Sequence, residues 1–474
     1  MDKSKILRIS DKIAMALLCV LMVDIGIFGA GKVVYVGPLS FRHALLLLLA
    51  MASVPLMLAK WRELAKHPFM WMIFVFFAWQ AVSAVIGVVN GHRTSLIITD
   101  LKGFAFFAFL PVFLCVLRTR ERVHLVMKAL VVSSTVLALI TVACLVVYLL
   151  DRQAIINFSA YGYEIQFSRI GCITAKIPRL YFMSGLYMLC GCAFGIYFQV
   201  VEKENKFSWL YSVVTGLCLF ALLLSYTRSV YLAIVVAAVV TVPAMLLRSD
   251  LQSRKKLLIH IVAAACVCLC LIGVFSVVGK TNYLGYAFSR TAVSLEQEDT
   301  TPTEMVPPDT IPTETEPPVP TEPPTELSEE EYWQQSYNDE TAASDALRLT
   351  TTQQLWENIR KSPLIGLGLG AEITSRPDGL NEYIYLDVWS KAGIVGLVLY
   401  FVPLLWMFLR IFKNGEEDIC NRREKSVWVA VLLGFMAYSY FNPYMNGSMG
   451  VLFYCCTMAI AQQKQKPLPG NDGY

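Results

Sequence analysis

The chain has 474 residues, of which 56% are hydrophobic and 16% are charged, and its mean hydropathy is +0.54. This composition excludes an ordinary soluble domain, because the apolar residues come in runs of about 20, the length at which a helix crosses the hydrocarbon layer. A formal net charge of +4 says little about partners, since it averages segments on opposite sides of a bilayer. We therefore predict an all-α polytopic membrane protein.

The apolar runs predict about twelve transmembrane helices. They cover residues 13–30, 41–59, 68–89, 96–117, 125–150, 180–201, 209–224, 230–247, 257–278, 393–412, 427–441 and 450–461. Basic residues such as Lys3, Lys5 and Arg8 gather at alternate ends of these runs, so the positive-inside rule places both termini in the cytoplasm of a multi-pass plasma-membrane protein. The long polar segment between runs nine and ten then becomes one large extracytoplasmic loop.

This reading divides the chain into three parts. They are helices one to nine (1–278), the extracytoplasmic loop (279–392), and helices ten to twelve with a cytoplasmic tail (393–474).

The loop itself has two parts of different character. Residues 296–331 are rich in proline, threonine and acidic side chains and have no aromatic residue, so we expect a disordered tether; a glycosylated or wall-spanning spacer is the alternative. Residues 344–392 are expected to form an ordered cap. Helical periodicity over 345–360, with Ser344 as N-cap and Pro363 beyond the end, predicts a helix there.

Arginines stand out on the predicted outer side. Arg228 lies in LSYTRSVY, between two apolar runs, where an unpaired arginine would cost about 2.5–3.5 kcal/mol. Its polar neighbours favour a functional role over a snorkelling anchor. Arg348 lies on the predicted loop helix and Arg290 follows the ninth run. Guanidinium groups that share a cavity would suit a diphosphate; solvated arginines that balance the acidic tether are the alternative.

Other polar groups have less specific patterns. Asp100 and Lys102 predict an ion pair within the fourth run, with a structural role favoured over a wall of the cavity. The alternating glycines of PLIGLGLG predict a tight backbone turn rather than a nucleotide site. Asn442 and Tyr444, between the last two runs, could bind sugar hydroxyls or simply build a turn. No residues have the spacing of a metal site.

Three stretches occur in a characteristic order. LSYTRSVY places a serine and an arginine at an outer membrane end, and LRLTTTQQLWENIRKSPLIGLGLG places an arginine on a helix before a proline and a glycine-rich turn. LNEYIYLDVWSKAGIVGLVLYF then leads through asparagine, aromatic residues and Gly-Ile-x-Gly into the next run. Together, over about residues 180–412, they resemble the O-antigen ligase and O-antigen polymerase family of bacterial envelope enzymes.

The resemblance implies a helical membrane enzyme that transfers a glycan from undecaprenyl diphosphate to an acceptor hydroxyl, with no metal, nucleotide or other cofactor. By position, Arg228 and Arg348 match the family's diphosphate-binding arginines, and Arg290 is a further candidate. Ligases of this family carry a histidine before the asparagine that matches Asn381, whereas this chain has Leu380. Leucine cannot accept a proton, so a polymerase-like member is favoured.

The missing histidine leaves the general base to carboxylates. The candidates are Glu382, with Asp378 and Asp387 behind it; for each of them a solvated surface carboxylate is the alternative. Asn381, Tyr383, Asn442 and Tyr444 are the candidate substrate-binding residues.

The sequence thus favours a membrane glycosyltransferase that extends or attaches surface polysaccharide. Its expected partners are an undecaprenyl-diphosphate-linked glycan, a glycan or lipid acceptor and membrane lipids, with no nucleic acid. The alternatives are a transporter or flippase of lipid-linked glycan and a non-catalytic glycan-binding family member. Because the polar groups concentrate at one surface and not at the midplane, surface chemistry is favoured over transport.

Overall fold

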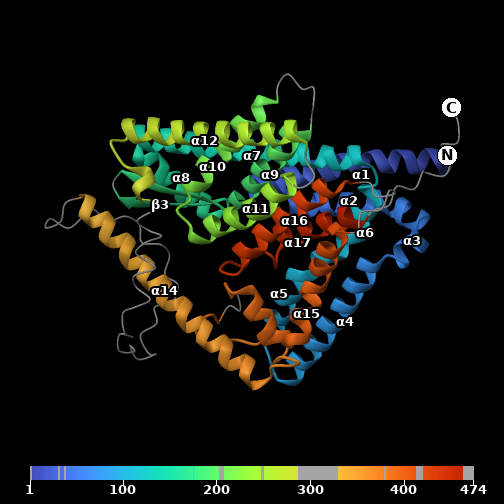
Figure 1. Ribbon diagram of the computed structural model, residues 1–474. Helices are drawn as coiled ribbons and strands as arrows, with labels where there is room; N and C mark the ends of the chain where they lie inside the picture. Colours follow the sequence, from blue (N-terminus) through green and yellow to red (C-terminus); the bar gives the residue numbers. More distant parts are fainter. Residues whose placement is uncertain are drawn as a thin grey trace.

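The computed structural model is a helical bundle with one long helix set apart from it (Figure 1). It describes residues 3–29, 33–36, 39–174, 176–201, 208–246, 250–286, 329–377, 381–412 and 420–462. The longer helices are α1 (Lys3–Phe28), α2 (Phe41–Ala59), α4 (Pro68–Val89), α7 (Arg120–Leu150), α9 (Met188–Val201), α10 (Trp209–Leu223), α11 (Arg228–Leu246), α12 (Leu251–Val278), α14 (Glu329–Lys361), α15 (Ile384–Phe412), α16 (Arg422–Ser439) and α17 (Ser448–Gln462). The shorter ones are α3 (Trp61–Ala65), α5 (Thr94–Ala105), η1 (Phe106–Phe109), α6 (Leu110–Val116), α8 (Arg152–Glu164) and η2 (Gly185–Tyr187).

Membrane crossing is supported by helix length and composition. Among the described residues, 7 helical segments are long and apolar enough to span a bilayer, and three shorter apolar helices accompany them. An all-helical, multi-pass membrane protein is therefore confirmed. The count of about twelve spans, the three-part division and the cytoplasmic placement of the termini stay predictions.

Two small antiparallel hairpins interrupt the helices. Strand β1 (Tyr35–Val36) pairs with β2 (Leu39–Ser40), and β3 (Ser168–Thr174) pairs with β4 (Ile177–Phe182). The prediction of a continuous span over 180–201 was wrong at its start, because the first residues of that apolar run belong to β4. An apolar run alone cannot distinguish a buried strand from a helix.

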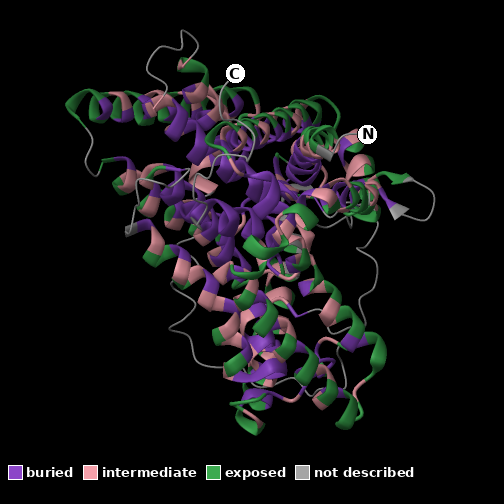
Figure 2. Ribbon diagram, turned by 90° about the vertical axis from the view of Figure 1, so that its right-hand side faces the viewer, coloured by how far each residue is buried: buried purple, intermediate pink, exposed green. Residues whose placement is uncertain are grey.

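Burial follows the pattern of a membrane protein. Nearly all of α16 and α17 is buried, and Phe194 of α9 and Phe453 of α17 pack against the fully buried Trp428 of α16. Buried residues gather in the middle of the bundle (Figure 2). Large apolar side chains remain exposed on peripheral helices, for example Leu58 on α2, Val85 on α4 and Val277 on α12. In a bilayer these apolar side chains would face lipid and not water.

Helix α14 forms a limb beside the bundle (Figure 1). It packs against α15 and β3 and ends where α4 also ends, at the lower tip of the view. The predicted helix over 345–360 is confirmed, but α14 begins at Glu329, so Ser344 lies inside the helix and is not its N-cap. The predicted tether loses its last three residues to α14; the rest of it, 296–328, lies outside the described residues.

The alternating glycines join α14 to the bundle. Gly366, Gly368 and Gly370 have φ of +77°, +94° and +77°, which side chains with a Cβ rarely adopt. A Cβ on Gly368 would lie 2.2 Å from the backbone nitrogen of Gly87 in α4. A Cβ on Gly366 would lie 2.5 Å from the nitrogen of Gly393, where α15 is broken by a φ of +67°. The predicted tight turn therefore brings backbone directly against α4 and α15.

Candidate functional site

Five charged side chains from four parts of the chain form a continuous series of ion pairs. Arg228, at the start of α11, has Nη1 3.8 Å from Oδ2 of Asp345 on α14. One turn further along α14, Arg348 places Nη1 3.2 Å from Asp345 Oδ1 and Nε 2.8 Å from Glu382 Oε2. Nη2 of Arg376 lies 2.9 Å from the other oxygen of Glu382. This series, Arg228–Asp345–Arg348–Glu382–Arg376, is called the arginine series below.

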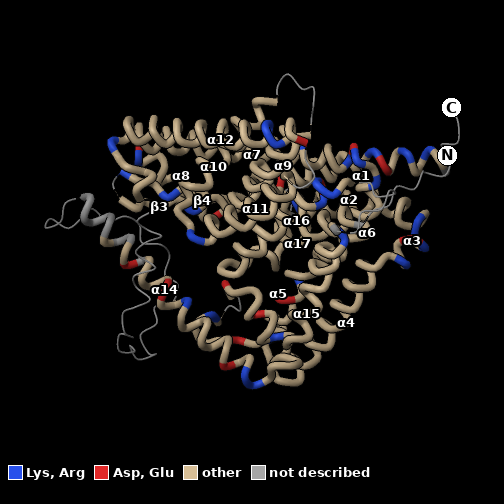
Figure 3. Tube along the Cα trace, viewed as in Figure 1, with Lys and Arg blue, Asp and Glu red and all other residues tan. Residues whose placement is uncertain are grey.

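The arginine series is open to its surroundings at one end. The side chains of Arg228 and Asp345 are 45% and 42% exposed, that of Arg348 is 36% exposed, and that of Arg376 is 15% exposed. Lys, Arg, Asp and Glu recur along α14, whereas they are sparse within the bundle (Figure 3). Three guanidinium groups face two carboxylates, so the series carries an excess of positive charge.

The pKa of Arg348 shows how strongly this side chain interacts with Glu382. Partial burial lowers the pKa of its guanidinium, but the hydrogen bond and the charge of Glu382 outweigh burial and raise that pKa above its usual value. Arg348 therefore stays charged, and the pair with Glu382 is a charge-assisted hydrogen bond of the stronger kind.

Local structure fixes the position of Arg228. Helix α10 ends at Leu223 and α11 starts at Arg228, with Tyr226 between them in a left-handed conformation (φ +47°) and buried. Arg179 of β4 donates from Nε to the backbone oxygen of Ser225 at 3.3 Å, which ties this turn to the hairpin. Arg228 is thus placed in the first turn of α11 by a folded connection, with a second guanidinium close by.

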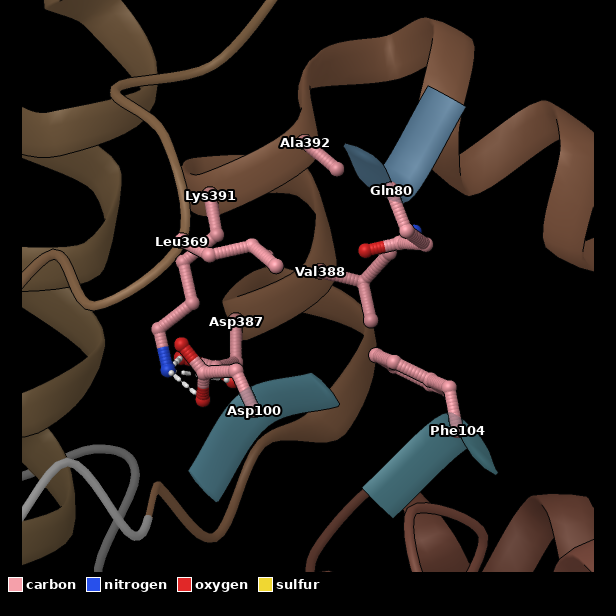
Figure 4. Close-up of a pocket in the computed structure, with 8 residues that line it drawn as sticks. All are labelled: Gln80, Asp100, Phe104, Leu369, Asp387, Val388, Lys391 and Ala392. Atoms are coloured by element: carbon pink, nitrogen blue, oxygen red, sulfur yellow. Dashed lines mark hydrogen bonds and ion pairs between the residues drawn. The ribbon is translucent and has the colours of Figure 1, made fainter. Parts of the chain in front are cut away.

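A second set of charged side chains, around Lys391 of α15, is buried in the protein. Nζ of Lys391 lies 2.9 Å from Asp100 Oδ1 and 2.9 Å from Asp387 Oδ1 (Figure 4). Asn381 donates its side-chain N–H to Asp387, and the backbone N–H of Gly370 donates to Asp100 Oδ2 at 2.7 Å. This group is called the lysine cluster below. The predicted pairing of Asp100 with Lys102 was wrong, because Asp100 pairs with Lys391, which comes from α15.

The space beside the lysine cluster is too small for a substrate. A cavity of about 10 Å³ is lined by Asp100, Asp387, Lys391 and Gln80, and Gln80 points into it from α4 (Figure 4). Neither polar side-chain atom of Gln80 has a hydrogen-bond partner among the described residues. Such a volume holds about one water molecule and no sugar ring. Asp387, which is buried and paired, is therefore placed to support the fold around Asn381.

The other predicted site residues lie at varied depths. Asn442 donates from Nδ2 to Ser229 Oγ at 3.0 Å, and Tyr383 is buried directly after Glu382. Tyr444 is buried against Phe435, with its hydroxyl unpartnered among the described residues. The predicted residues Asp378 and Arg290, and Leu380, lie outside the described residues.

Three members of these clusters were not assigned a role from sequence. They are Asp345, Arg376 and Lys391. For two of them the sequence does carry a signal, because side chains three or four residues apart lie next to each other on a helix. Asp345 lies three residues before Arg348, and Lys391 lies four residues after Asp387. The position of Arg376 depends on the turn after α14, for which the sequence gives no register. Among the described residues, no three His, Cys, Asp or Glu side chains gather in a way that could hold a metal ion.

Fold and site together define a multi-pass helical membrane protein with an arginine-rich polar site where α11, α14 and α15 meet. The model of the O-antigen ligase family matches residues 213–401, somewhat less than half of the chain, and this segment contains every member of the arginine series. The match confirms the resemblance to the O-antigen ligase and polymerase family and indicates a membrane enzyme of surface-polysaccharide assembly. The comparisons with curated proteins and with solved structures gave no match.

Proposed function

We propose that the protein transfers glycan from an undecaprenyl-diphosphate-linked oligosaccharide to an acceptor hydroxyl, at the extracytoplasmic face of the plasma membrane. One observation carries the proposal: Arg228 and Arg348, from separate helices, both contact the carboxylate of Asp345. Two guanidinium groups that lie within reach of one carboxylate are also within reach of one diphosphate.

The arginine series suits the leaving group of such a reaction. As the bond to the glycan breaks, negative charge builds up on the diphosphate, which leaves carrying about two to three negative charges that must be stabilised in place. Arg228 and Arg348 supply forked donors, and the net positive charge of the series favours an anion over the resident carboxylates. Arg290 is proposed as a further contact on the strength of its position in the sequence.

Glu382 is the proposed base. Its two oxygens accept from Arg348 and Arg376, so it is held beside the proposed position of the diphosphate and is paired with both guanidinium groups. A diphosphate that takes the donors of Arg348 would release Glu382 Oε2. The freed carboxylate would then accept the proton of the acceptor hydroxyl as that oxygen bonds to the anomeric carbon. The anomeric bond to phosphate breaks, and undecaprenyl diphosphate leaves with the electron pair.

The lysine cluster supports the position of Glu382. Asn381 is held by Asp387 and directly precedes Glu382, so the cluster fixes the backbone on which the proposed base is carried. Asn381, Tyr383 and Asn442 are proposed as substrate contacts, and Asp378 stays a further candidate base. With Leu380 in place of the ligases' histidine, we favour polymerisation over ligation.

A non-catalytic glycan-binding protein is the second candidate, because both described candidate bases are paired with cations. A single experiment separates the functions: purified protein in vesicles receives a lipid-linked repeat unit and no nucleotide. Growth of a glycan chain supports the transferase, movement of the unit across the bilayer without growth supports a flippase, and binding alone supports the non-catalytic protein. Loss of growth in Arg228→Ala, with normal membrane insertion, would place Arg228 in the site.

A further inference from the structure

An aromatic pair lies at the edge of the arginine series. Tyr383, the residue after Glu382, is buried, and its ring is 5.9 Å from that of Tyr440 and 6.2 Å from that of Phe441. Both contacts are edge-to-face, with interplanar angles of 81° and 61°, and the rings of Tyr440 and Phe441 are themselves 4.8 Å apart. Tyr440 and Phe441 are 44% and 36% exposed, so part of each side chain can be reached from outside.

The same pair also connects to the other end of the series. Asn442, the next residue after Phe441, donates to Ser229 Oγ at 3.0 Å, and Ser229 follows Arg228. Together with three pairs of sequence neighbours, these contacts form a closed ring. In order, it runs through Arg228, Asp345, Arg348, Glu382, Tyr383, Phe441, Asn442 and Ser229. One arc of this ring is charged, and the other carries the rings of Tyr383 and Phe441 and the polar side chains of Asn442 and Ser229.

We propose that Tyr440 and Phe441 form a stacking platform for the sugar rings nearest the diphosphate of the lipid-linked glycan. The proposal rests on the proposed function, since its ligand is the lipid-linked glycosyl diphosphate of that reaction. A glycosyl diphosphate has the same two-part chemistry as the ring of contacts: an anion that pairs with guanidinium groups, joined to a sugar with an apolar C–H face and polar edges. Aromatic faces beside amide and carboxylate groups suit that sugar.

The surroundings of the platform favour a sugar over acyl chains. Aromatic residues at membrane interfaces anchor helices when they border apolar surface. Here the rings lie next to polar side chains: Tyr383, which they contact, follows Glu382, and Asn442, which follows Phe441, donates to Ser229 beside Arg228. Sugar hydroxyls can hydrogen-bond to polar side chains, whereas an acyl chain would cover them without such bonds, which costs free energy.

The test uses the full chain in lipid nanodiscs and two probes. One is the lipid-linked repeat unit extracted from cells that make this chain; the other is bare undecaprenyl diphosphate. We expect Tyr440→Ala combined with Phe441→Ala to weaken binding of the repeat unit about five- to tenfold and to leave bare-lipid binding unchanged. Tyr440→Phe keeps the ring and should bind normally. Tyr161→Ala, which removes an exposed tyrosine from α8, is the matched control.

The outcomes separate the platform from the diphosphate site. Equal weakening for both lipids, or no change for either, would overturn the platform. Loss of repeat-unit binding in the aromatic variant, together with normal binding of both lipids by Arg348→Ala, would support the platform and overturn the proposed diphosphate contact. If the double variant does not fold, Tyr440→Leu alone carries the same comparison, because Tyr440 is 44% exposed.

Discussion

The arginine series and the lysine cluster are built from the same kinds of residue and differ mainly in exposure. In the arginine series, the side chains of Arg228, Asp345 and Arg348 are 45%, 42% and 36% exposed. In the lysine cluster, the ammonium of Lys391 is 3% exposed and its two carboxylate partners are 12% exposed. Both groups involve residues of one short stretch, because Asn381 and Glu382 are adjacent in the chain.

Exposure decides what each group can do. An exposed ion pair contributes little stability, so its partners can exchange for another anion at small cost. A buried pair cannot be broken without leaving an unpaired charge, so it fixes the backbone around it. We therefore assign ligand binding to the arginine series and structural support to the lysine cluster. The variants below test that assignment.

The largest effect is expected when the lysine cluster loses its cation. Lys391→Met would leave Asp100 and Asp387 facing each other in a buried site, at a cost of about 3–5 kcal/mol. The expected result is a markedly lower thermal unfolding temperature of the purified protein in nanodiscs. Lys102→Met, which removes an exposed lysine from α5, is the matched control. Equal unfolding temperatures for the two variants would show that the cluster is not a structural support.

The next effect concerns activity and leaves stability nearly unchanged. Arg348→Ala removes a donor from the proposed diphosphate site and should lower the rate of glycan transfer about a hundredfold or more. Its unfolding temperature should stay close to that of the parent protein, since Arg348 is partly exposed. Arg360→Ala, at an exposed arginine of the same helix, provides the control. Normal transfer by Arg348→Ala would remove the arginine series from the reaction.

These two groups also show how far sequence reasoning reaches. Apolar runs located most helices, because a spanning helix needs a continuous length that the sequence displays directly. They failed at 180–182, where the same residue types form β4. Arg228 and Arg348 were found because family motifs mark them. Asp100 was matched with the wrong lysine, because its partner comes from a helix almost 300 positions away (|i−j|=291) and no local pattern records that contact.

A change at Glu382 should separate binding from chemistry. Glu382→Gln keeps the shape of the side chain but cannot take a proton, so transfer should fall about a hundredfold. Binding of bare undecaprenyl diphosphate should persist or become tighter, because a neutral amide competes less well for Arg348 and Arg376 than a carboxylate does. Binding assays and transfer assays on the same preparation check both halves. Unchanged transfer would move the role of base to another group, with Asp378 the next to test.

The smallest effect on glycan transfer is expected at the glycine turn that joins the two groups. Gly368→Ala would place a Cβ 2.2 Å from the nitrogen of Gly87 at a φ of +94°. The backbone strain alone should cost about 1–3 kcal/mol. The overlap with the backbone of α4 adds to that cost and must shift the turn, which lies between Arg348 on α14 and the lysine cluster on α15. We expect a clear fall in unfolding temperature together with a modest loss of transfer. Gly171→Ala in β3, where a Cβ meets nothing within 4 Å, should change neither. Full transfer activity in Gly368→Ala would show that the arginine series keeps its geometry when the turn is distorted. The arginine series and the lysine cluster would then be independent of each other.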